Sequence, residues 1–318
     1  MRAVVTGAGG FVGGAVARLL RARGDHVVAP VRDPNRASAL TAVGVEVVRD
    51  DLSDVQRLTT LLDAADAAIH VAGSYRVGIP RREHDAMWDA NVGTTTRLLD
   101  AAKAAGTPRI VYVSTVNAFG NTRGSVVDES YRRDVAAGFL SWYDETKYRA
   151  HEVAEQRAWA GAPIVIVLPS QVYGPGDHSA FGNQLRRAHD GTLRVRALDD
   201  VGVRLVHVDD LAAGIVAALD RGEPGRAYVL SGPTTTLRDA IAIVARVGGR
   251  RPPRLRVPTP LLQAVAAIAR LAGRPELAEL VDASSGVTYW ASAARAESEL
   301  GFSARPIEDG LRDTFGSA

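Results

Sequence analysis

A tyrosine and a lysine four residues apart, Tyr143 and Lys147, are the pair in this sequence best suited to chemistry. On a helix, residues with this spacing project from one face about one turn apart. An ammonium group so close favours the ionised phenol, so we expect it to lower the pKa of Tyr143 and make this tyrosine a general acid or base. A helix surface pair has the same spacing, so the residues around the pair decide between the two readings.

A glycine-rich segment near the start of the chain predicts a cofactor site. The β-rich run Arg2 to Thr6 leads into glycines at positions 7, 10 and 13, and a helical pattern follows from Ala15 to Arg23. A strand that enters a helix through glycines lets the backbone approach a pyrophosphate, whose charge then rests on the helix N-terminus. We expect a dinucleotide to be held here by Gly7, Gly10, Phe11 and Val12.

The elements that must position these residues alternate between strands and helices. Strands are expected at Arg2 to Thr6, His26 to Val31, Val45 to Val48, Ala67 to Val71, Arg109 to Val113 and Ile164 to Leu168. Repeated strand-helix-strand units with right-handed crossovers give an α/β fold with a doubly wound parallel sheet. In such sheets the ligand crevice lies off the carboxyl ends of the strands. Thr115, Ala72, Gly73, Pro169 and Ser170 all follow such ends, so we place them beside the cofactor.

The end of the second strand indicates which dinucleotide binds. An acid there accepts from a ribose 2′-hydroxyl, whereas an arginine meets a 2′-phosphate. Arg32 comes first and Arg36 lies one turn on, which favours NADP(H). Asp33 keeps NAD(H) open, and Arg36 could equally be a solvated helix charge.

Two glycines and two prolines at residues 169–176 mark where the chain leaves the sheet. We therefore expect a dinucleotide-binding domain at 1–169, with returns near 204–231, and a substrate-binding lobe at 170–318. Core elements are expected at Arg204 to Asp210 and Tyr228 to Ser231. The long loop 121–140 is a candidate substrate wall. Other candidate wall residues are Ser74, Tyr75, Phe139, Gln171, Tyr173, Phe181 and Asn183.

Composition excludes several classes of protein. The formal charge is +2, with 38 basic residues scattered among 36 acidic ones, so no nucleic-acid partner is expected. There is no cysteine, which excludes disulfides and thiolate zinc sites, and we predict no metal. The apolar stretch Leu261 to Ala269 is far below the ~18 residues of a membrane span and is expected to pack on the second lobe. With too short an apolar run at the start for a signal peptide, we predict a cytoplasmic protein without a membrane partner.

Several motifs occur in an order that is highly specific. They are Thr6-Gly7 to Gly13, Asp51-Leu52, Asn91-Val92-Gly93-Thr94, Val113-Ser114-Thr115, Tyr143 with Lys147, Val172-Tyr173-Gly174-Pro175 and His207-Val208-Asp209-Asp210. Together they resemble the extended short-chain dehydrogenase/reductase family over nearly the whole chain. The resemblance implies a Rossmann domain that binds a nicotinamide cofactor and a smaller C-terminal α+β lobe that closes over a small-molecule substrate.

The resemblance also implies roles for individual residues. Thr115 would hydrogen-bond the reacting oxygen, Tyr143 would be the acid/base, and Lys147 would bind the nicotinamide ribose. Asp51 and Leu52 would lie at the adenine. Asn91 and His207 are expected to be structural. A homodimer through the helices near 82–105 and 141–160 is implied as well.

Two departures from the family pattern bear on the substrate. Leu168 stands where an arginine usually precedes the proline, and Leu198-Asp199-Asp200 replaces a Gly-Asp-Gly turn before Arg204. The absence of that turn weakens the case for a nucleotide diphosphate in the second lobe. Val31-Arg32-Asp33-Pro34 resembles the dihydroflavonol-reductase-like branch, which reduces ketones or aldehydes with NADPH.

Three functions follow. The first is an NADP(H)-dependent reductase of a small to medium, partly apolar ketone or aldehyde. The second is a nucleotide-sugar epimerase or dehydratase with tightly bound NAD. The third is a dinucleotide sensor without catalysis, which would be expected to lose Tyr143 or Lys147.

Overall fold

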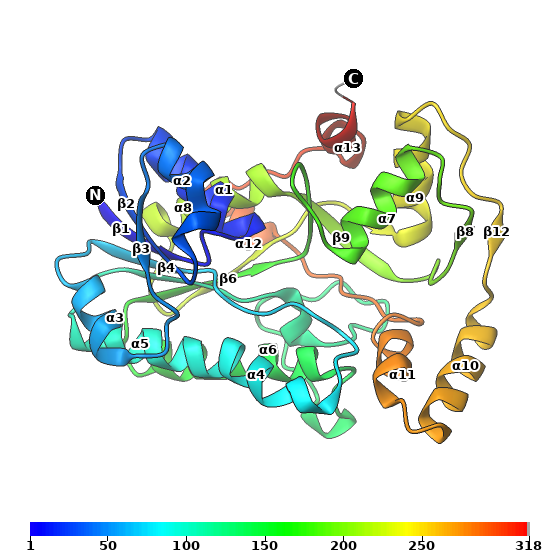
Figure 1. Ribbon diagram of the computed structural model, residues 1–318, viewed down its shortest axis with the longest axis horizontal. Helices are drawn as coiled ribbons and strands as arrows, with labels where there is room; N and C mark the ends of the chain where they lie inside the picture. The colour runs from blue at the N-terminus through cyan, green and yellow to red at the C-terminus, as the bar shows by residue number, and fades with distance from the viewer. Residues whose placement is uncertain (317–318) are drawn as a thin grey trace.

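The computed structural model describes residues 1–316, and a seven-stranded sheet forms its centre (Figure 1). The strands are β1 (Arg2–Thr6), β2 (His26–Val31), β3 (Glu46–Arg49), β4 (Ala67–His70), β5 (Ile110–Val113), β6 (Ile164–Pro169) and β10 (Ala227–Leu230). Their order is β10-β6-β5-β4-β1-β2-β3, and every pair is parallel. The predicted doubly wound Rossmann sheet is therefore confirmed.

Helices cover both faces of this sheet, as Figure 1 shows. One face carries α1 (Phe11–Ala22), α2 (Ser38–Ala42), α8 (Val208–Arg221) and α12 (Ala294–Leu300). The other carries α3 (Val55–Leu62), α5 (Thr94–Ala104) and α6 (Trp142–Trp159). Strands covered on both faces should be apolar throughout rather than alternating. Strand β6, with the sequence IVIVLP, is buried at every position.

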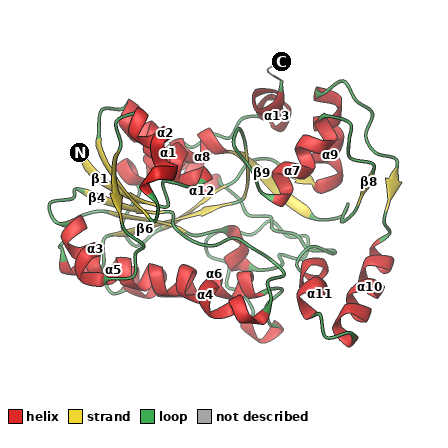
Figure 2. Ribbon diagram, viewed as in Figure 1, coloured by secondary structure: helices red, strands yellow, loops and turns green. Residues whose placement is uncertain are grey.

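The remaining chain builds a smaller lobe (Figure 2). Its three-stranded sheet joins β7 (Gln171–Tyr173), β9 (Gly202–His207) and β11 (Thr234–Thr236). The helices α7 (Ala180–His189), α9 (Leu237–Val247) and α13 (Ile307–Phe315) pack against it. Strands β8 (Val195–Arg196) and β12 (Leu255–Arg256) pair separately, and α10 (Thr259–Leu271) and α11 (Pro275–Asp282) form a helical hairpin.

The two core elements expected near 204–231 lie in different sheets. Tyr228 and its neighbours form β10 of the main sheet, and α8 packs on α1, as expected of core elements. Residues 204–207 instead belong to β9 in the smaller sheet, because their backbone pairs with β7 and β11.

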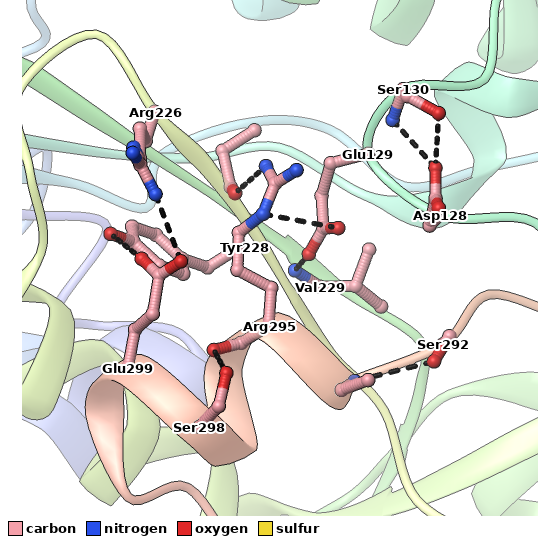
Figure 3. A network of polar contacts seen from close by, with 12 residues as sticks. Asp128, Glu129, Ser130, Arg226, Tyr228, Val229, Ser292, Arg295, Ser298 and Glu299 are labelled. Atoms are coloured by element: carbon pink, nitrogen blue, oxygen red, sulfur yellow. Dashed lines mark hydrogen bonds and ion pairs between the residues drawn. The ribbon is translucent and has the colours of Figure 1, made fainter.

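Side chains cover the outer edge of strand β10 (Figure 3). The Glu129 carboxylate accepts from the backbone N–H of Val229 at 2.8 Å, and Arg295 donates to the carbonyl of Ala227 at 3.1 Å. Arg295 and Glu129 also pair with each other at 3.7 Å. The free N–H and C=O groups of an edge strand can pair with another chain. Here Glu129 and Arg295 bond the N–H of Val229 and the carbonyl of Ala227, so these groups need no further strand.

Within residues 1–316, no helix is both long and apolar enough to cross a membrane.

Candidate active site

Tyr143 lies in the first turn of α6, where the cap of the helix fixes it. The Ser141 hydroxyl caps this end by accepting from the N–H of Asp144 at 3.0 Å. The Tyr143 side chain is 7% exposed and packs with the apolar side chains of Ile79 and Met87. The phenol therefore sits in an apolar environment at the start of a helix whose position is set by its own sequence.

The pKa of Tyr143 differs from the one the sequence predicts. Burial raises it well above the usual value, while the nearby Thr115 hydroxyl lowers it in part. Burial also lowers the pKa of Lys147 to about 8. The prediction that Lys147 brings the pKa of Tyr143 toward neutrality is therefore wrong for the chain by itself. The physical reason is that desolvation disfavours the charged form of both groups.

Two hydroxyls follow strand β5, and only one of them faces Tyr143. The Ser114 hydroxyl pairs with Nδ1 of His151 at 3.0 Å, so it is directed into the structure. The Thr115 hydroxyl lies close enough to the Tyr143 phenol to lower the pKa of that phenol. It also donates a hydrogen bond to the side-chain oxygen of Asn117 at 3.1 Å. The structure thus brings together the three residues predicted to be catalytic, with Thr115 at the strand tip and Tyr143 and Lys147 on one helix.

The glycine-rich loop is shaped by close backbone contacts. Gly7 has φ +72°, and a Cβ there would lie 2.7 Å from the backbone nitrogen of Ala72. A Cβ at Gly13 would lie 2.2 Å from the carbonyl oxygen of Gly7. Helix α1 starts at Phe11 after Gly10, which has no side chain to cap it. The N–H groups of the first turn, at Phe11 and Val12 among others, have no partner within the helix, so the loop fits a pyrophosphate.

A buried histidine connects this loop to the helices, and the sequence analysis missed it. The Thr6 hydroxyl lies 2.7 Å from Nδ1 of His70, and Nε2 of His70 lies 3.1 Å from the Thr95 hydroxyl. Thr95 donates its own proton to the carbonyl of Asn91 at 2.7 Å, so it must accept from His70. Nε2 therefore carries the proton, and Nδ1 accepts from Thr6. The signal in the sequence was a histidine that closes the otherwise apolar strand Ala67-Ala68-Ile69-His70.

Asn91 holds a second loop in place, which agrees with the structural role expected of it. It lies in a π-helical turn, Asp89–Gly93, between α4 (His84–Trp88) and α5. Its side chain accepts from the N–H of Ser74 at 2.7 Å and donates to the Thr146 hydroxyl on α6 at 2.9 Å. A Cβ at Gly73 would lie 3.0 Å from this amide and 3.8 Å from Nζ of Lys147. The loop of Ala72 and Gly73 therefore passes directly beside the catalytic helix.

At the end of β2, the side chains of Arg32 and Arg36 are exposed, and the Asp33 carboxylate is hydrogen-bonded. The Asp33 carboxylate accepts from the N–H of Asn35 at 3.1 Å and caps the 3₁₀ turn Pro34–Ala37. Within residues 1–316, neither Arg32 nor Arg36 pairs with a carboxylate.

The predicted adenine residues form a tight turn after β3. Leu52 has φ +64°, a conformation rare for a branched residue, and Asp50 holds it by accepting from its N–H at 2.7 Å. Asp51 is exposed, and the Ser53 hydroxyl donates to it at 2.6 Å, which lowers the pKa of Asp51. Strain of this kind gathers at functional sites.

Pro169 and Ser170 come where the chain leaves the main sheet. Pro169 is the last residue of β6, and the N–H of Ser170 donates to the carbonyl of Leu230 at 3.1 Å. The Ser170 hydroxyl is buried and has no partner among the described residues. It is a polar group available to a ligand at the carboxyl end of the sheet.

The loop before α6 is fastened to the catalytic helix. Arg133 forms a two-pronged ion pair with Asp144 at 2.5 and 2.7 Å, and both side chains are almost fully buried. From the second lobe, the Glu279 carboxylate on α11 accepts from the N–H of Gly78 at 3.0 Å and from the N–H of Trp142. Both attachments lie next to Tyr143 in the sequence.

The predicted substrate wall is only partly present. The Tyr75 ring meets the Tyr143 ring edge-on at 4.8 Å, so Tyr75 lies at the site. Tyr173 is instead 1% exposed and packs edge-on against His207 in the core of the second lobe. The Phe139 ring lies 5.5 Å from the ring of Tyr148 on α6, tilted by 51°. Apolar packing competes for aromatic side chains, and the sequence does not show which of them it takes.

The sequence matches the NAD dependent epimerase/dehydratase family over residues 3–231. A "Putative dihydroflavonol 4-reductase" of Synechocystis sp. is 32% identical over 266 residues, covering 80% of this chain and 74% of that protein. A 2-alkyl-3-oxoalkanoate reductase of Shewanella oneidensis is 28% identical over 333 residues, covering 98% and 84%.

Solved structures share the fold. The crystal structure of gox2253 matches with a TM-score of 0.84 and 32% identity, covering 99% of this chain and 97% of that one. A UDP-glucuronic acid 4-epimerase mutant from Bacillus cereus, in complex with a sugar nucleotide analogue and NAD, matches with a TM-score of 0.81 and 20% identity, covering 99% and 98%. The family match covers most of the chain, and a relative above 30% identity spans four-fifths of it. This chain is therefore a member of the NAD-dependent epimerase/dehydratase family, an NAD(P)-dependent enzyme of the extended short-chain dehydrogenase/reductase type.

Proposed function

We propose that this enzyme reduces a ketone or aldehyde of a small to medium, partly apolar substrate with NADP(H). The observation that carries the proposal is the buried Tyr143 phenol beside the Thr115 hydroxyl, with Lys147 one turn away. Because burial raises the pKa of Tyr143, the phenol keeps its proton at neutral pH and is ready to give it to a substrate oxygen.

Different residues of the chain would bind the cofactor and act on the substrate. The loop from Gly7 to Val12 would hold the pyrophosphate, and Lys147 would meet the nicotinamide ribose. When bound, the dinucleotide supplies the hydride that reduces the carbonyl carbon. Thr115 donates to the carbonyl oxygen as negative charge develops on it, turning its hydroxyl from Asn117, and Tyr143 delivers the proton that completes the alcohol.

The end of β2 supports NADP(H) over NAD(H). The Asp33 carboxylate accepts a hydrogen bond from a backbone N–H, whereas Arg32 and Arg36 have no carboxylate partner in the described part of the chain. A 2′-phosphate would give these guanidinium groups a partner of opposite charge.

The second candidate is a nucleotide-sugar epimerase or dehydratase with retained NAD, which is what several fold relatives are named. The replacement of a Gly-Asp-Gly turn by Leu198-Asp199-Asp200 weighs against a nucleotide diphosphate in the second lobe. Arg204 donates to the backbone carbonyl of Ala291 at 2.6 Å, and Asp199 pairs with Arg196 at 2.9 Å. Nε of Arg204 and Oδ1 of Asp199 are buried and have no partner among the described residues.

The test follows loss of NADPH absorbance with a panel of ketones and aldehydes. Tyr143→Phe should lower kcat roughly 10²- to 10⁴-fold, because it removes the proton donor while keeping the ring. NADPH affinity should stay close to that of the wild type. Tyr148→Phe, on the same helix but facing Phe139, is the matched control and should keep its activity.

An active Tyr143→Phe enzyme would show that the proton comes from elsewhere. Tightly retained NAD, together with sugar-nucleotide turnover and no net cofactor consumption, would instead establish the epimerase or dehydratase.

A further inference from the structure

The α10–α11 hairpin lies at the end of the second lobe (Figure 1), and α10 exposes a row of apolar side chains. Leu261, Val265, Ile268 and Leu271 on α10 are 55, 53, 65 and 90% exposed. The first three are spaced four and three residues apart, so they lie along one face of the helix. Only Ala266 and Ala269 of α10 are buried, so the stretch predicted to pack on the second lobe packs through a narrow face. Monomeric proteins rarely expose contiguous apolar patches of this kind without a use for them.

The chain around this helix is strongly basic. Between Asp239 and Glu276 there is no acidic residue, and there are seven arginines, Arg246, Arg250, Arg251, Arg254, Arg256, Arg270 and Arg274. All seven are exposed. Among residues 1–316, only Arg270 of this set forms an ion pair, with Asp282. Figure 1 shows the segment of β12 running along one margin of the molecule into α10, so Arg254 and Arg256 adjoin the apolar face, whereas the end of α9 lies at the other end of this lobe.

In contrast to the expectation of no membrane partner, we propose that this surface, the exposed face of α10 with Arg254, Arg256 and Arg274, binds an anionic phospholipid bilayer. A helix with one apolar face and cationic neighbours lies in the plane of the interface, with its apolar side chains among the acyl chains and its charges at the headgroups. Leu255, 66% exposed between Arg254 and Arg256, adds to the apolar surface.

A second copy of the chain is a poorer occupant of this surface. Two-fold association places the same patch on both sides of an interface, and here it would bring unpaired arginines against arginines. A bilayer with anionic headgroups satisfies both the apolar residues and the charges.

The surface is also connected to the active site. Helix α11, against which α10 packs, holds the N–H groups of Gly78 and Trp142 through Glu279. The proposed lipid contact therefore lies on the hairpin that touches the helix of Tyr143. Binding to lipid rests on this surface alone and does not depend on the proposed reaction.

Co-sedimentation with vesicles tests the proposal. The purified enzyme should bind vesicles of phosphatidylcholine mixed with phosphatidylglycerol, bind pure phosphatidylcholine weakly, and release as salt is raised. Val265→Glu should lower binding at least ~10-fold, because it puts a charge among the acyl chains. Val126→Glu is the control, since Val126 is 55% exposed and lies outside the hairpin. Leu271→Glu is a second variant with the same expectation.

A double substitution tests the contribution of the arginines to vesicle binding. Arg254→Ser with Arg256→Ser should weaken binding about fivefold for each arginine removed. The control is Arg18→Ser with Arg49→Ser, which are also exposed but lie on α1 and β3 of the main domain. No binding to either vesicle by a folded, monodisperse protein would overturn the proposal. Equal binding by the Val265 and Val126 variants would also overturn it, as would a change of oligomeric state in Val265→Glu without vesicle binding by the wild type.

Discussion

At the scale of single residues, the site depends on which groups burial keeps uncharged. Tyr143 retains its proton because its environment is apolar, and burial together with the Lys147 ammonium lowers the pKa of His70 to about 3. The neutral His70 accepts from Thr6 beside the glycine loop and donates to Thr95 on α5. His70 therefore makes both hydrogen bonds, to Thr6 and to Thr95, only while it is neutral.

Because of His70, the free energy of unfolding decreases as the pH falls. The unfolded chain takes up a proton at this residue as pH drops through the ordinary histidine pKa of ~6.5, whereas the folded chain does not until about pH 3. Stability is therefore lost as pH falls through that window, by about 2 kcal/mol between pH 7 and pH 5. In urea unfolding, His70→Gln should reduce this pH dependence by that amount. His178→Gln, at an exposed histidine without an ion pair among the described residues, is the matched control.

The cofactor preference is also decided by single residues. Arg32→Ser should weaken NADPH binding roughly tenfold to a hundredfold, because a charged hydrogen-bond donor to a 2′-phosphate is lost. NADH binding should hardly change, since NADH has no such phosphate. Fluorescence titration with both nucleotides measures the ratio, and Arg49→Ser on the neighbouring strand is the control. Equal loss for the two nucleotides would contradict the assigned role.

At the scale of elements, the strand-loop-helix unit from β1 to α1 works because its backbone segments touch. Both Gly13 and Gly14 lie inside α1, where alanine would normally stabilise a helix by about 1 kcal/mol. A Cβ at Gly13 would meet the backbone of Gly7 at 2.2 Å, which a side-chain adjustment cannot relieve. A Cβ at Gly14 would meet its nearest atom, the carbonyl oxygen of Ala8, at 3.1 Å.

Gly13→Ala should therefore lower NADPH affinity at least ~10-fold, a change of about 1.4 kcal/mol or more, by displacing the loop at Gly7. Gly14→Ala should bind NADPH nearly as well as the wild type, with at most a small change in melting temperature. Titration and thermal unfolding of both variants provide the comparison. Normal binding by Gly13→Ala would mean that the loop tolerates the displacement.

The sequence was informative where a local pattern dictates the element. Strands β1 and β2 lie at the predicted residues, β4, β5 and β6 differ by one residue at one end, and β3 is shifted by one residue. Apolar runs bounded by glycine or charged residues restrict where a strand can begin and end. The π-helical turn at Asn91 and the lobe contacts of Glu279 were not predictable. Each depends on side chains that meet across 17 to 201 positions of sequence.

At the scale of the whole molecule, two surfaces remain for other partners. The α10 face is apolar and basic, whereas the sequence predicted a helix there that packs on the second lobe. Helices α5 and α6 lie side by side on the opposite side of the sheet from α1 (Figure 1), and Arg157 on α6 pairs with Asp100 on α5. Trp159 near the end of α6 is 65% exposed, and Trp88 on α4 is 38% exposed.

We expect the enzyme to form a homodimer through α5 and α6, since a large exposed aromatic side chain on a helix pair is a typical interface anchor. Light scattering after gel filtration should give the mass of two chains for the wild type and of one chain for Trp159→Glu, which would bury a charge in the interface. Leu271→Glu, on the α10 face, should remain dimeric. If the Leu271 variant became monomeric while the Trp159 variant stayed dimeric, the copies would meet through α10, and the lipid-binding surface would be an interface between chains instead.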